Sequence, residues 1–434
     1  ILNYTLNETQ TILVNSSREI LGAQQGFQGL APINPAFLEY QNRTKQSPAR
    51  TSRMVDSSTL PSNTRHTTII PLNDGSTTQV SLDGEIPPPI DFSYTQGQSV
   101  NLAAVSLDGG SGYPSSYDLR SLSRVSSVKN QGNAGTCWAF AAISSLESSL
   151  LPGESWDFSE KNLANTNGFD YAWDYGGQDL MATAYMTRWS GPVLESDDPY
   201  SDVTSTSPSG LPVYKHVQNV FFLPVRSSLT DINNIKDALM NKGAVKASIL
   251  YNNSYYKTAT YAFYNDGSLT GLDPYQDDTT STNHAITIVG WDDSYSRTNF
   301  KTPPSGDGAF IVKNSWGTSF GNSGYFYISY YDLTIGDVCT VYTGEPVTNY
   351  DRIYSYDPLG WVQSVGFGTT SAQFANVFTA QSAETLNAIG VYTTTPGSYT
   401  ARIYLDPSGG PINTTGYVAE TSWTNSLLGY QTVN

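Results

Sequence analysis

The chain is poor in cysteine, in charge of positive sign and in long apolar runs, and each shortage excludes a class of protein. Two cysteines in 434 residues cannot form the disulfide framework that stabilises many secreted domains. No apolar stretch approaches the about 18 residues that a membrane-spanning helix needs. Lysine and arginine number 22 against 38 acidic residues, and the net charge of −16 argues against nucleic acid or an anionic membrane as partner.

Polar uncharged residues, glycine and tyrosine are abundant, which favours an extracytoplasmic, β-rich protein. Six sequons give weak support for export: Asn3, Asn7, Asn15, Asn42, Asn252 and Asn413. Because exported eukaryotic proteins normally carry disulfides, the two-cysteine count favours a prokaryotic cell surface. Ile1 is not an initiator methionine and no signal-peptide pattern remains, so we expect the natural start of the chain to have been removed.

One cysteine lies where a loop of small residues enters an apolar helix. The loop runs from Lys129 to Thr136, and Cys137 follows it. Apolar residues recur on one helical face up to Leu150, and Pro152 ends the helix. The first turn of a helix favours negative charge, so this position lowers the pKa of a thiol from about 8.5 towards the thiolate range. The pattern predicts a reactive cysteine, with a buried helix-capping cysteine as the alternative.

A thiolate nucleophile needs a base, and the chain offers three histidines. His66 lies in a polar stretch and His216 opens a strand-like run, so we interpret both as surface or strand-edge residues. His284 instead follows a long polar loop and begins an apolar run, where a loop enters a buried strand. A second buried strand ends at Asn314, just before Trp316. Such an asparagine can accept a hydrogen bond from the imidazole and orient it under an apolar cover.

At these residues the sequence resembles the papain family of cysteine peptidases. Three motifs carry the resemblance, in the family's order: Gln131-Gly132 with Gly135-Thr136-Cys137-Trp138-Ala139-Phe140 for the nucleophile, Thr282-Asn283-His284-Ala285 for the histidine, and Asn314-Ser315-Trp316-Gly317 for the asparagine. The resemblance implies that Cys137 is the nucleophile and that His284 is the general base and acid. It also implies that Asn314 orients His284, that Trp316 shields their hydrogen bond, and that the Gln131 amide with the Cys137 backbone N–H forms the oxyanion hole. For a cysteine paired in this way we expect a pKa of about 3 to 4.

The resemblance extends to the substrate cleft. Glycines at such a place let a peptide backbone approach and pair in β fashion, although a plain turn is the alternative. The predicted substrate-binding residues are Gly176, Gly177, Gln178 and Asn283, and Asp179 and Thr282 are expected beside them. The cysteines usual in this lobe of the family are replaced by Ala134, Thr166 and Asp174, so the family's disulfides there cannot form. We interpret the remaining cysteine, Cys339, as a buried free thiol.

The first 112 residues carry no catalytic motif. The predicted elements there are a short helix after Asn34-Pro35, a mobile polar segment over Gln46–Ser62, strands at Thr67–Pro71 and Thr78–Leu82, and an extended proline-rich arm at Glu85–Asp91. The peptidase-like part begins only at Tyr113. We therefore hypothesise that residues 1–112 pack on the peptidase and include an inhibitory pro-segment, with a purely structural extension as the alternative.

The rest of the chain divides into a part with both predicted helices and predicted strands and a C-terminal part with predicted strands only. Helices are predicted at Met181–Trp189 and Asp231–Asn241, and strands at Val220–Leu223, Val245–Leu250, Ala309–Lys313 and Tyr325–Tyr330. From Pro346 onward, short strands with turn signals between them predict a β-sandwich: Ala375–Ala380, Leu386–Thr393, Tyr399–Leu405 and Tyr417–Trp423. The last strand signal lies close to the final residue, which fits a domain that is cut short.

We therefore predict an α+β protein with an N-terminal extension or pro-region (1–112), a two-lobed papain-like peptidase domain (113–345) and a lectin-like β-sandwich (346–434). The whole resembles prokaryotic surface peptidases of the papain family. The predicted function is a secreted cysteine endopeptidase that forms a covalent thioester acyl-enzyme. The alternative is a surface adhesion or carbohydrate-binding protein with a silent peptidase domain. We expect protein or peptide substrates, cell-surface glycans at the C-terminal domain, a monomer, no membrane span, and neither a cofactor nor a metal.

Overall fold

The computed structural model describes residues 4–6, 11–20, 28–45, 67–100, 112–171, 173–201, 206–269, 282–406, 416–426 and 428–434. The chain divides into two compact units. The larger unit comprises Ile33–Val347 with Pro358–Val362, and the smaller comprises Ile1–Pro32, Thr348–Asp357 and Gln363–Asn434. The polar segment predicted over Gln46–Ser62 and the side chain of His66 lie outside the described residues.

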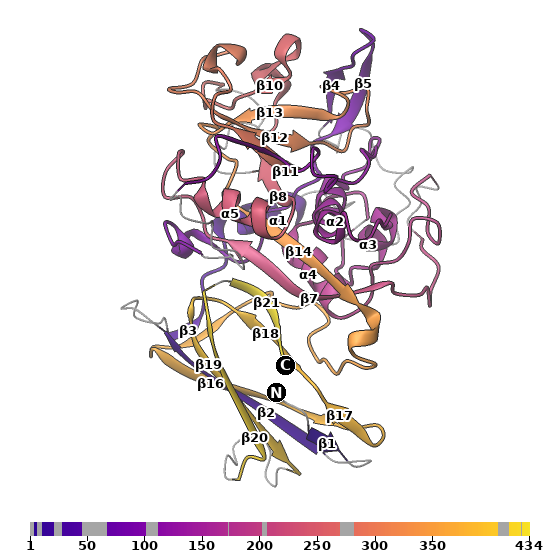
Figure 1. Ribbon diagram of the computed structural model, residues 1–434, viewed down its shortest axis with the longest axis vertical. Coiled ribbons are helices and arrows are strands. Elements are labelled where there is room, and N and C mark those ends of the chain that lie inside the picture. Colours follow the sequence, from indigo (N-terminus) through magenta and orange to yellow (C-terminus); the bar gives the residue numbers. More distant parts are fainter. Residues whose placement is uncertain are drawn as a thin grey trace. The chain divides into compact units, whose positions relative to one another are not determined.

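Three helices form the helical lobe of the larger unit (Figure 1): α2 (Cys137–Leu150), α3 (Glu160–Thr166) and α4 (Asp179–Thr187). Helix α2 is buried from Cys137 to Ser148, because it packs on α3 and α4 as well as on the strands β8, β11 and β14. The predicted central helix is therefore confirmed. Ser159 begins α3 by accepting a hydrogen bond from the Asn162 backbone N–H at 3.0 Å.

A mostly antiparallel sheet forms the strand lobe, with the order β7-β14-β8-β11-β12-β13-β10-β9 and β6 beside β11. The strands are β6 (Ser116–Asp118), β7 (Lys215–Leu223), β8 (Val245–Ile249), β9 (Tyr256–Lys257), β10 (Ala262–Phe263), β11 (His284–Asp292), β12 (Ala309–Lys313), β13 (Tyr325–Ser329) and β14 (Cys339–Pro346). Helix α5 (Asn233–Asn241) packs on β8 and β11. Strand β11 is buried from His284 to Trp291, which explains its nearly unbroken apolar sequence.

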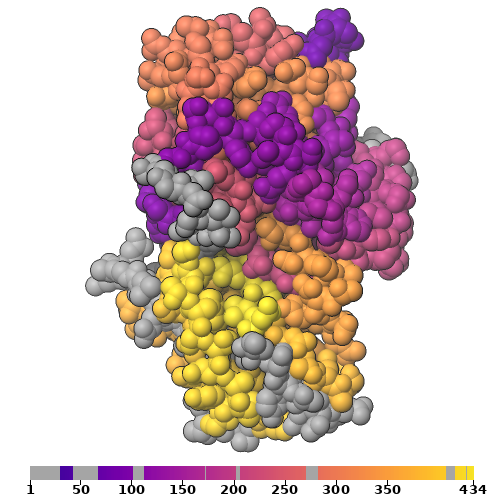
Figure 2. All heavy atoms as spheres, in the orientation of Figure 1, coloured from indigo at the N-terminus to yellow at the C-terminus, as the bar shows by residue number. Residues whose placement is uncertain are grey.

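The larger unit begins with α1 (Pro35–Lys45), which Asn34 caps by accepting the Ala36 backbone N–H at 3.1 Å. Strands β4 (Thr67–Pro71) and β5 (Thr77–Ser81) form an antiparallel hairpin that projects from the unit (Figure 2). The extended arm follows, and we define it as Leu82–Ile90. It is buried along its whole length except at Asp83. Short 3-10 turns complete the unit: η4 (Ser93–Thr95), η5 (Asn253–Tyr255), η6 (Thr258–Thr260) and η7 (Arg297–Asn299). A further 3-10 turn, η8 (Val347–Asn349), lies where the chain passes from the larger to the smaller unit.

The smaller unit consists of strands: β1 (Tyr4–Leu6), β2 (Thr11–Ile20), β3 (Gln28–Leu30), β15 (Val365–Phe367), β16 (Ser371–Thr379), β17 (Glu384–Leu386), β18 (Ile389–Thr393), β19 (Gly397–Leu405), β20 (Ala419–Asn425) and β21 (Leu428–Val433). Four of them form a sheet in the order β16-β2-β19-β20, and the others pair as β1–β17, β3–β15 and β18–β21. The buried residues Ala380, Ile389, Ala401 and Ile403 form a hydrophobic core in the smaller unit. The strand-rich fold predicted for the C-terminal part is confirmed.

The first residues differ from the predicted N-terminal extension over 1–112. Strand β2 lies between β16 and β19, so residues 1–32 belong to the smaller, β-rich unit. Residues 15–19 are all polar, and a stretch without apolar alternation carries no strand signal. The partners of β2 follow residue 370 in the chain, and no local pattern can indicate such a pairing.

Candidate active site

Cys137 and His284 lie together at the meeting point of the two lobes. Cys137 is the first residue of α2, His284 is the first residue of β11, and neither is exposed. The backbone N–H of Ala285 donates a hydrogen bond to the Cys137 Sγ at 3.2 Å, so the residue next to the histidine contacts the sulfur. Helix α2 packs directly on β11. The fold thus brings the predicted nucleophile beside the predicted base.

Asn314 follows β12 and fixes the imidazole. Its Oδ1 lies 2.9 Å from His284 Nε2, and the same oxygen accepts the Ser315 backbone N–H at 2.8 Å. Because an amide oxygen can only accept, this geometry assigns the proton to Nε2. Nδ1 of His284 has no hydrogen-bond partner among the described residues, so it is the nitrogen that remains able to take a proton.

Trp316 covers this hydrogen bond. Its ring stacks on the imidazole of His284, with 4.5 Å between ring centroids and 23° between planes. Tyr251 and Phe320 pack edge-on against Trp316, at 4.8 Å and 4.9 Å between centroids. These rings cover the His284–Asn314 pair on the side of Trp316. The tyrosine was not identified from the sequence, because it lies outside the three motifs.

Gln131 is held beside the nucleophile by the residue after Asn314. Its Oε1 accepts a hydrogen bond from Ser315 Oγ at 2.6 Å, and its backbone N–H donates to the Ser315 carbonyl at 2.8 Å. Its Nε2 donates to the Ala134 carbonyl at 2.8 Å. A carboxamide nitrogen carries two hydrogens, so one remains for a ligand. Ser315 is a positioning residue that the sequence motifs contained but did not distinguish.

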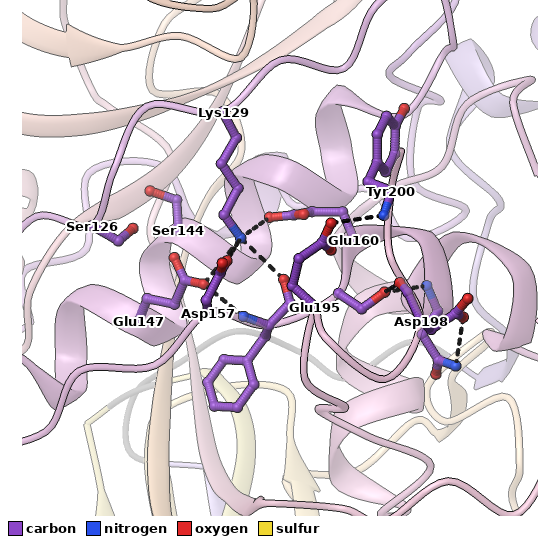
Figure 3. A network of polar contacts seen from close by, with 12 residues as sticks. Ser126, Lys129, Ser144, Glu147, Asp157, Glu160, Glu195, Asp198 and Tyr200 are labelled. Carbon is purple, nitrogen blue, oxygen red and sulfur yellow. Dashed lines mark hydrogen bonds and ion pairs between the residues drawn. The ribbon is translucent and has the colours of Figure 1, made fainter. Parts of the chain in front are cut away.

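The loop that carries Gln131 is anchored by an ionic network in which Glu147 and Glu160 are buried (Figure 3). Lys129 Nζ lies 3.2 Å from Glu147 of α2, 2.7 Å from Asp157 and 2.8 Å from Glu160 of α3. Although burial alone lowers it, the pKa of Lys129 is raised by the carboxylates of Glu160 and Glu147. Burial in turn raises the pKa of Glu160 to about 8. The network ties the start of the loop to both helices, which fixes Gln131 relative to Cys137.

The arm lies across the nucleophile. Gly177 donates its backbone N–H to the Gly84 carbonyl at 3.4 Å and accepts the Ile86 N–H at 2.8 Å, which makes a parallel β-bridge between Glu85 and Gly177. A Cβ added to Gly84 would lie only 2.2 Å from Cys137 Sγ, so the arm needs glycine there. Gly177 of the predicted glycine pair is thus paired with an extended segment of the same chain.

Burial under the arm determines the protonation state of the site. It raises the pKa of the Cys137 thiol to about 12, and the nearby Glu85 carboxylate adds to this effect. Burial also lowers the pKa of His284 to about 4. With the arm in place, both groups are therefore neutral between these values. Burial thus shifts both pKa values towards the neutral thiol and the neutral imidazole, opposite to the thiolate that the helix terminus alone favours.

Two predicted substrate-binding residues are engaged elsewhere. Gln178 Oε1 accepts the Leu180 backbone N–H at 2.7 Å, which caps α4. Asn283 accepts the Tyr251 N–H at 2.7 Å and donates to the Tyr251 carbonyl at 3.0 Å. Both side chains are buried while the arm is in place, and both satisfy backbone groups. Asp179, expected beside them, forms an ion pair with Lys246.

The second cysteine of the chain also lies in the larger unit. Cys339 is a buried free thiol at the start of β14, as predicted. Within the described ranges, no group of histidine, cysteine and acidic side chains is arranged to hold a metal ion. No helix in the described part of the chain has the length and apolar character needed to cross a membrane.

Together, these features are those of a two-lobed cysteine peptidase fold joined to a β-rich domain. Residues 113–343 match the family described as papain family cysteine protease, and residues 353–434 match the lectin like domain. The chain belongs to the papain family of cysteine proteases. It also carries a C-terminal lectin-like domain.

Two similar proteins support the assignment of the chain to the papain family. The senescence-specific cysteine protease SAG12 of Arabidopsis thaliana is 32% identical over 222 residues, which are 50% of this chain and 56% of that protein. A cysteine protease of Blomia tropicalis is 28% identical over 248 residues, 55% of this chain and 67% of that protein. The chain thus spans little more than half the length of the first of these relatives.

Two solved structures share the fold. The cysteine protease and lectin-like domains of Cwp84, a surface layer associated protein of Clostridium difficile, superpose with a TM-score of 0.64 at 23% identity, covering 93% of this chain and 80% of that one. Cwp84 after propeptide cleavage gives a TM-score of 0.55 at 25% identity, covering 74% and 80%. The first match includes both the peptidase fold and the lectin-like fold.

Proposed function

We propose that the protein is a cysteine endopeptidase that hydrolyses peptide bonds in proteins or peptides. Cys137 is the nucleophile, His284 the general base and acid, and Asn314 the residue that orients the imidazole. Gln131 Nε2 and the Cys137 backbone N–H stabilise the oxyanion. The observation that carries the proposal is the 2.9 Å His284–Asn314 hydrogen bond, which leaves Nδ1 of a fixed imidazole free beside a cysteine at a helix N-terminus.

The reaction follows from these positions. The thiol proton of Cys137 passes to His284 Nδ1, and the sulfur attacks the carbonyl carbon of the peptide bond. The resulting oxyanion accepts hydrogen bonds from Gln131 and the Cys137 backbone. The C–N bond breaks as the leaving amine takes the proton from Nδ1, which leaves a thioester. Water, deprotonated by His284, then attacks the thioester, releases the carboxylic acid and restores the thiol.

We propose further that the chain as described is a zymogen. The arm occupies the place along Gly177 that a substrate needs, and Gly84 lies against the sulfur. One of the related structures is of Cwp84 after propeptide cleavage, which supports a processed form for this chain. Residues 46–66 and 101–111 flank the hairpin and the arm on both sides, so cutting within both segments would free the arm.

A doubly cut enzyme tests both proposals. One specific protease site is inserted within residues 46–66 and a second within 101–111, and cleavage of an internally quenched peptide mixture is followed before and after cutting. We expect cleavage only after both cuts, and its loss when an alkylating reagent labels Cys137. Equal rates before and after cutting would contradict the zymogen proposal. A doubly cut enzyme that cleaves nothing would contradict the peptidase proposal and favour a silent domain.

The lectin-like domain supports a role at a cell surface. We propose that it binds surface glycans and that the protein acts as an extracellular, prokaryotic monomer, because the composition favours export and the Cwp84 relative is surface-layer associated. A glycan array probed with the Cys137→Ala protein tests the binding. Retention on no glycan of the array would contradict this part of the proposal, without bearing on the peptidase.

A further inference from the structure

The arm places one acidic side chain in a buried polar cluster near the nucleophile. Glu85 is only 6% exposed, and its Oε1 lies 2.6 Å from Lys246 Nζ and 2.7 Å from Ser248 Oγ. Lys246 lies on β8 and is itself completely buried. Asp179, at the start of α4, contributes a second contact to the ammonium, at 2.7 Å.

The three hydrogens of the Lys246 ammonium are all used. They go to Glu85, to Asp179 and to Ser248 Oγ, which lies 2.8 Å from Nζ. Asp179 alone balances the charge of the lysine. Glu85 therefore adds a charge-assisted hydrogen bond, and its removal leaves one buried N–H without an acceptor. A side chain that places a hydrogen-bond acceptor at the position of the Glu85 oxygen restores this bond. Such a side chain should therefore bind more tightly than one without an acceptor.

The position of this pocket ties it to substrate binding. Glu85 is the residue of the arm that pairs with Gly177, and its neighbour Gly84 is the residue against Cys137 Sγ. A peptide that extends along Gly177 in the place of the arm would put one side chain at the sulfur and the next into the Lys246 pocket. The pocket is thus one residue away from the bond that is cut.

We propose that Lys246, Asp179 and Ser248 form a specificity pocket that selects substrates with glutamate next to the residue held at Cys137. This inference rests on the proposed peptidase function and names its substrate class. Glutamate makes the two contacts that Glu85 makes. Glutamine offers an uncharged acceptor, aspartate is one methylene shorter, leucine offers no acceptor, and lysine adds a second ammonium beside Lys246.

Substrate profiling of the doubly cut enzyme is the first test. Internally quenched peptides carry glutamate, glutamine, aspartate, leucine or lysine at one varied place, which is either the second residue before the cleaved bond or the first residue after it. At one of these two places we expect glutamate to exceed leucine by about tenfold or more in kcat/KM, with glutamine between them and lysine lowest. Leucine equal to glutamate at both places would overturn the proposal.

Variants assign the preference to the pocket. Lys246→Met leaves Asp179 buried without its partner, which threatens folding, so the double variant Lys246→Gln/Asp179→Asn is the main test. We expect its glutamate preference over leucine to shrink to about twofold or less, by the loss of the charged hydrogen bond. Lys236→Met is the matched control, since Lys236 of α5 is also buried and pairs with Asp293 at 2.7 Å. A double variant that keeps the full glutamate preference would overturn the proposal.

A binding measurement separates this inference from the proposed function. The doubly cut Cys137→Ala protein is titrated with a fluorescent peptide of sequence 80–92 and with the same peptide carrying Glu85→Leu. We expect at least about tenfold weaker binding for the leucine peptide. If no peptide is cleaved by the wild-type enzyme but this difference is seen, the peptidase proposal fails and the pocket stands. If cleavage occurs but both peptides bind equally, the pocket proposal fails alone.

Discussion

The two cysteines of this chain are equally well buried, yet their surroundings are of different kinds. Cys137 is 0% and Cys339 is 3% exposed, and burial raises the pKa of each thiol to about 12. Cys339 begins a strand paired with Leu223 and Ala247, inside the sheet. Cys137 begins a helix and is covered by the arm. Burial raises the pKa of both thiols, and only Cys137 is covered by a segment that we propose is released by cutting.

Removing each sulfur in turn gives the largest expected contrast. In the doubly cut enzyme, Cys137→Ala should lower kcat by about a millionfold, because the covalent step loses its nucleophile. Cys339→Ala should leave kcat within about twofold and cost only some stability, since Cys339 contacts no reacting group. Steady-state cleavage of a quenched peptide measures both. Comparable losses of kcat in the two variants would contradict the proposal that only Cys137 takes part in catalysis.

Gln131→Ala removes a feature that Cys137 has and Cys339 lacks, an oxyanion donor. We expect kcat to fall by about a hundred- to a thousandfold, with little change in KM, because the donor acts on charge that develops in the transition state. Asn241→Ala is the control, as this carboxamide on α5 donates to the Asp237 carbonyl at 2.9 Å. A fall in kcat of less than about tenfold would remove Gln131 from the proposed mechanism.

Asn314→Ala should have a smaller effect, because it loosens the imidazole without removing a reacting atom. We expect a loss in kcat of about a hundredfold, the cost typical of a misplaced catalytic group. The thermal unfolding midpoint should be followed alongside, since the Ser315 N–H also loses its acceptor. An unchanged kcat in a folded variant would contradict the role given to Asn314.

Gly84→Ala changes the cover of Cys137 and leaves that of Cys339 intact. A methyl group 2.2 Å from the sulfur cannot be accommodated, so the arm should open more often in the uncut chain. We expect the alkylation rate of Cys137 to rise by about tenfold or more. The rate at Cys339 is the internal control. Equal rates for the Gly84→Ala and wild-type chains would mean that the arm does not limit access.

The smallest expected effect is a gradual change with pH in how tightly the arm binds over Cys137. Burial, with Asp179 adding to it, raises the pKa of docked Glu85 from its ordinary 4.5 to about 7. Docking therefore takes up a proton between these values, so the arm should bind most tightly below about pH 4.5 and loosen as the pH rises through 7. Hydrogen exchange at the Gly177 and Ile86 amides, corrected for intrinsic rates, measures this. A Glu85→Gln chain that keeps the same pH profile would contradict it.

Much of the peptidase part was predictable from the sequence, since its signals are local. The helix after Cys137 and the strands beginning at His284 and ending at Lys313 follow from apolar periodicity. The motifs likewise predicted Gln131 and Trp316, whose side chains do meet Ser315 and His284. The single lysine in the apolar strand Val245–Ile249 is a sequence signal of the Glu85 pocket, because a lysine is rarely fully buried without a charged partner.

The rest depends on long-range pairing, which no local pattern encodes. The position of β2 in a sheet with β16 and β19 is one example. The arm is another, because the raised pKa of Cys137 depends on where Gly84 lies, and the helix position alone indicated the opposite shift. Gln178 and Asn283 were expected to contact substrate, but their amides instead satisfy neighbouring backbone groups. Side-chain contacts of this kind are settled only by the fold.

The most direct test compares alkylation rates of the two thiols before and after the arm is cut free, with each site read by mass spectrometry at pH 6. The account predicts that both thiols react slowly in the uncut chain, and that cutting accelerates labelling at Cys137 by about a hundredfold or more while Cys339 stays slow, since exposure of Cys137 restores its thiolate. If Cys137 stays as slow as Cys339 after cutting, the arm does not control the nucleophile, and the account is contradicted.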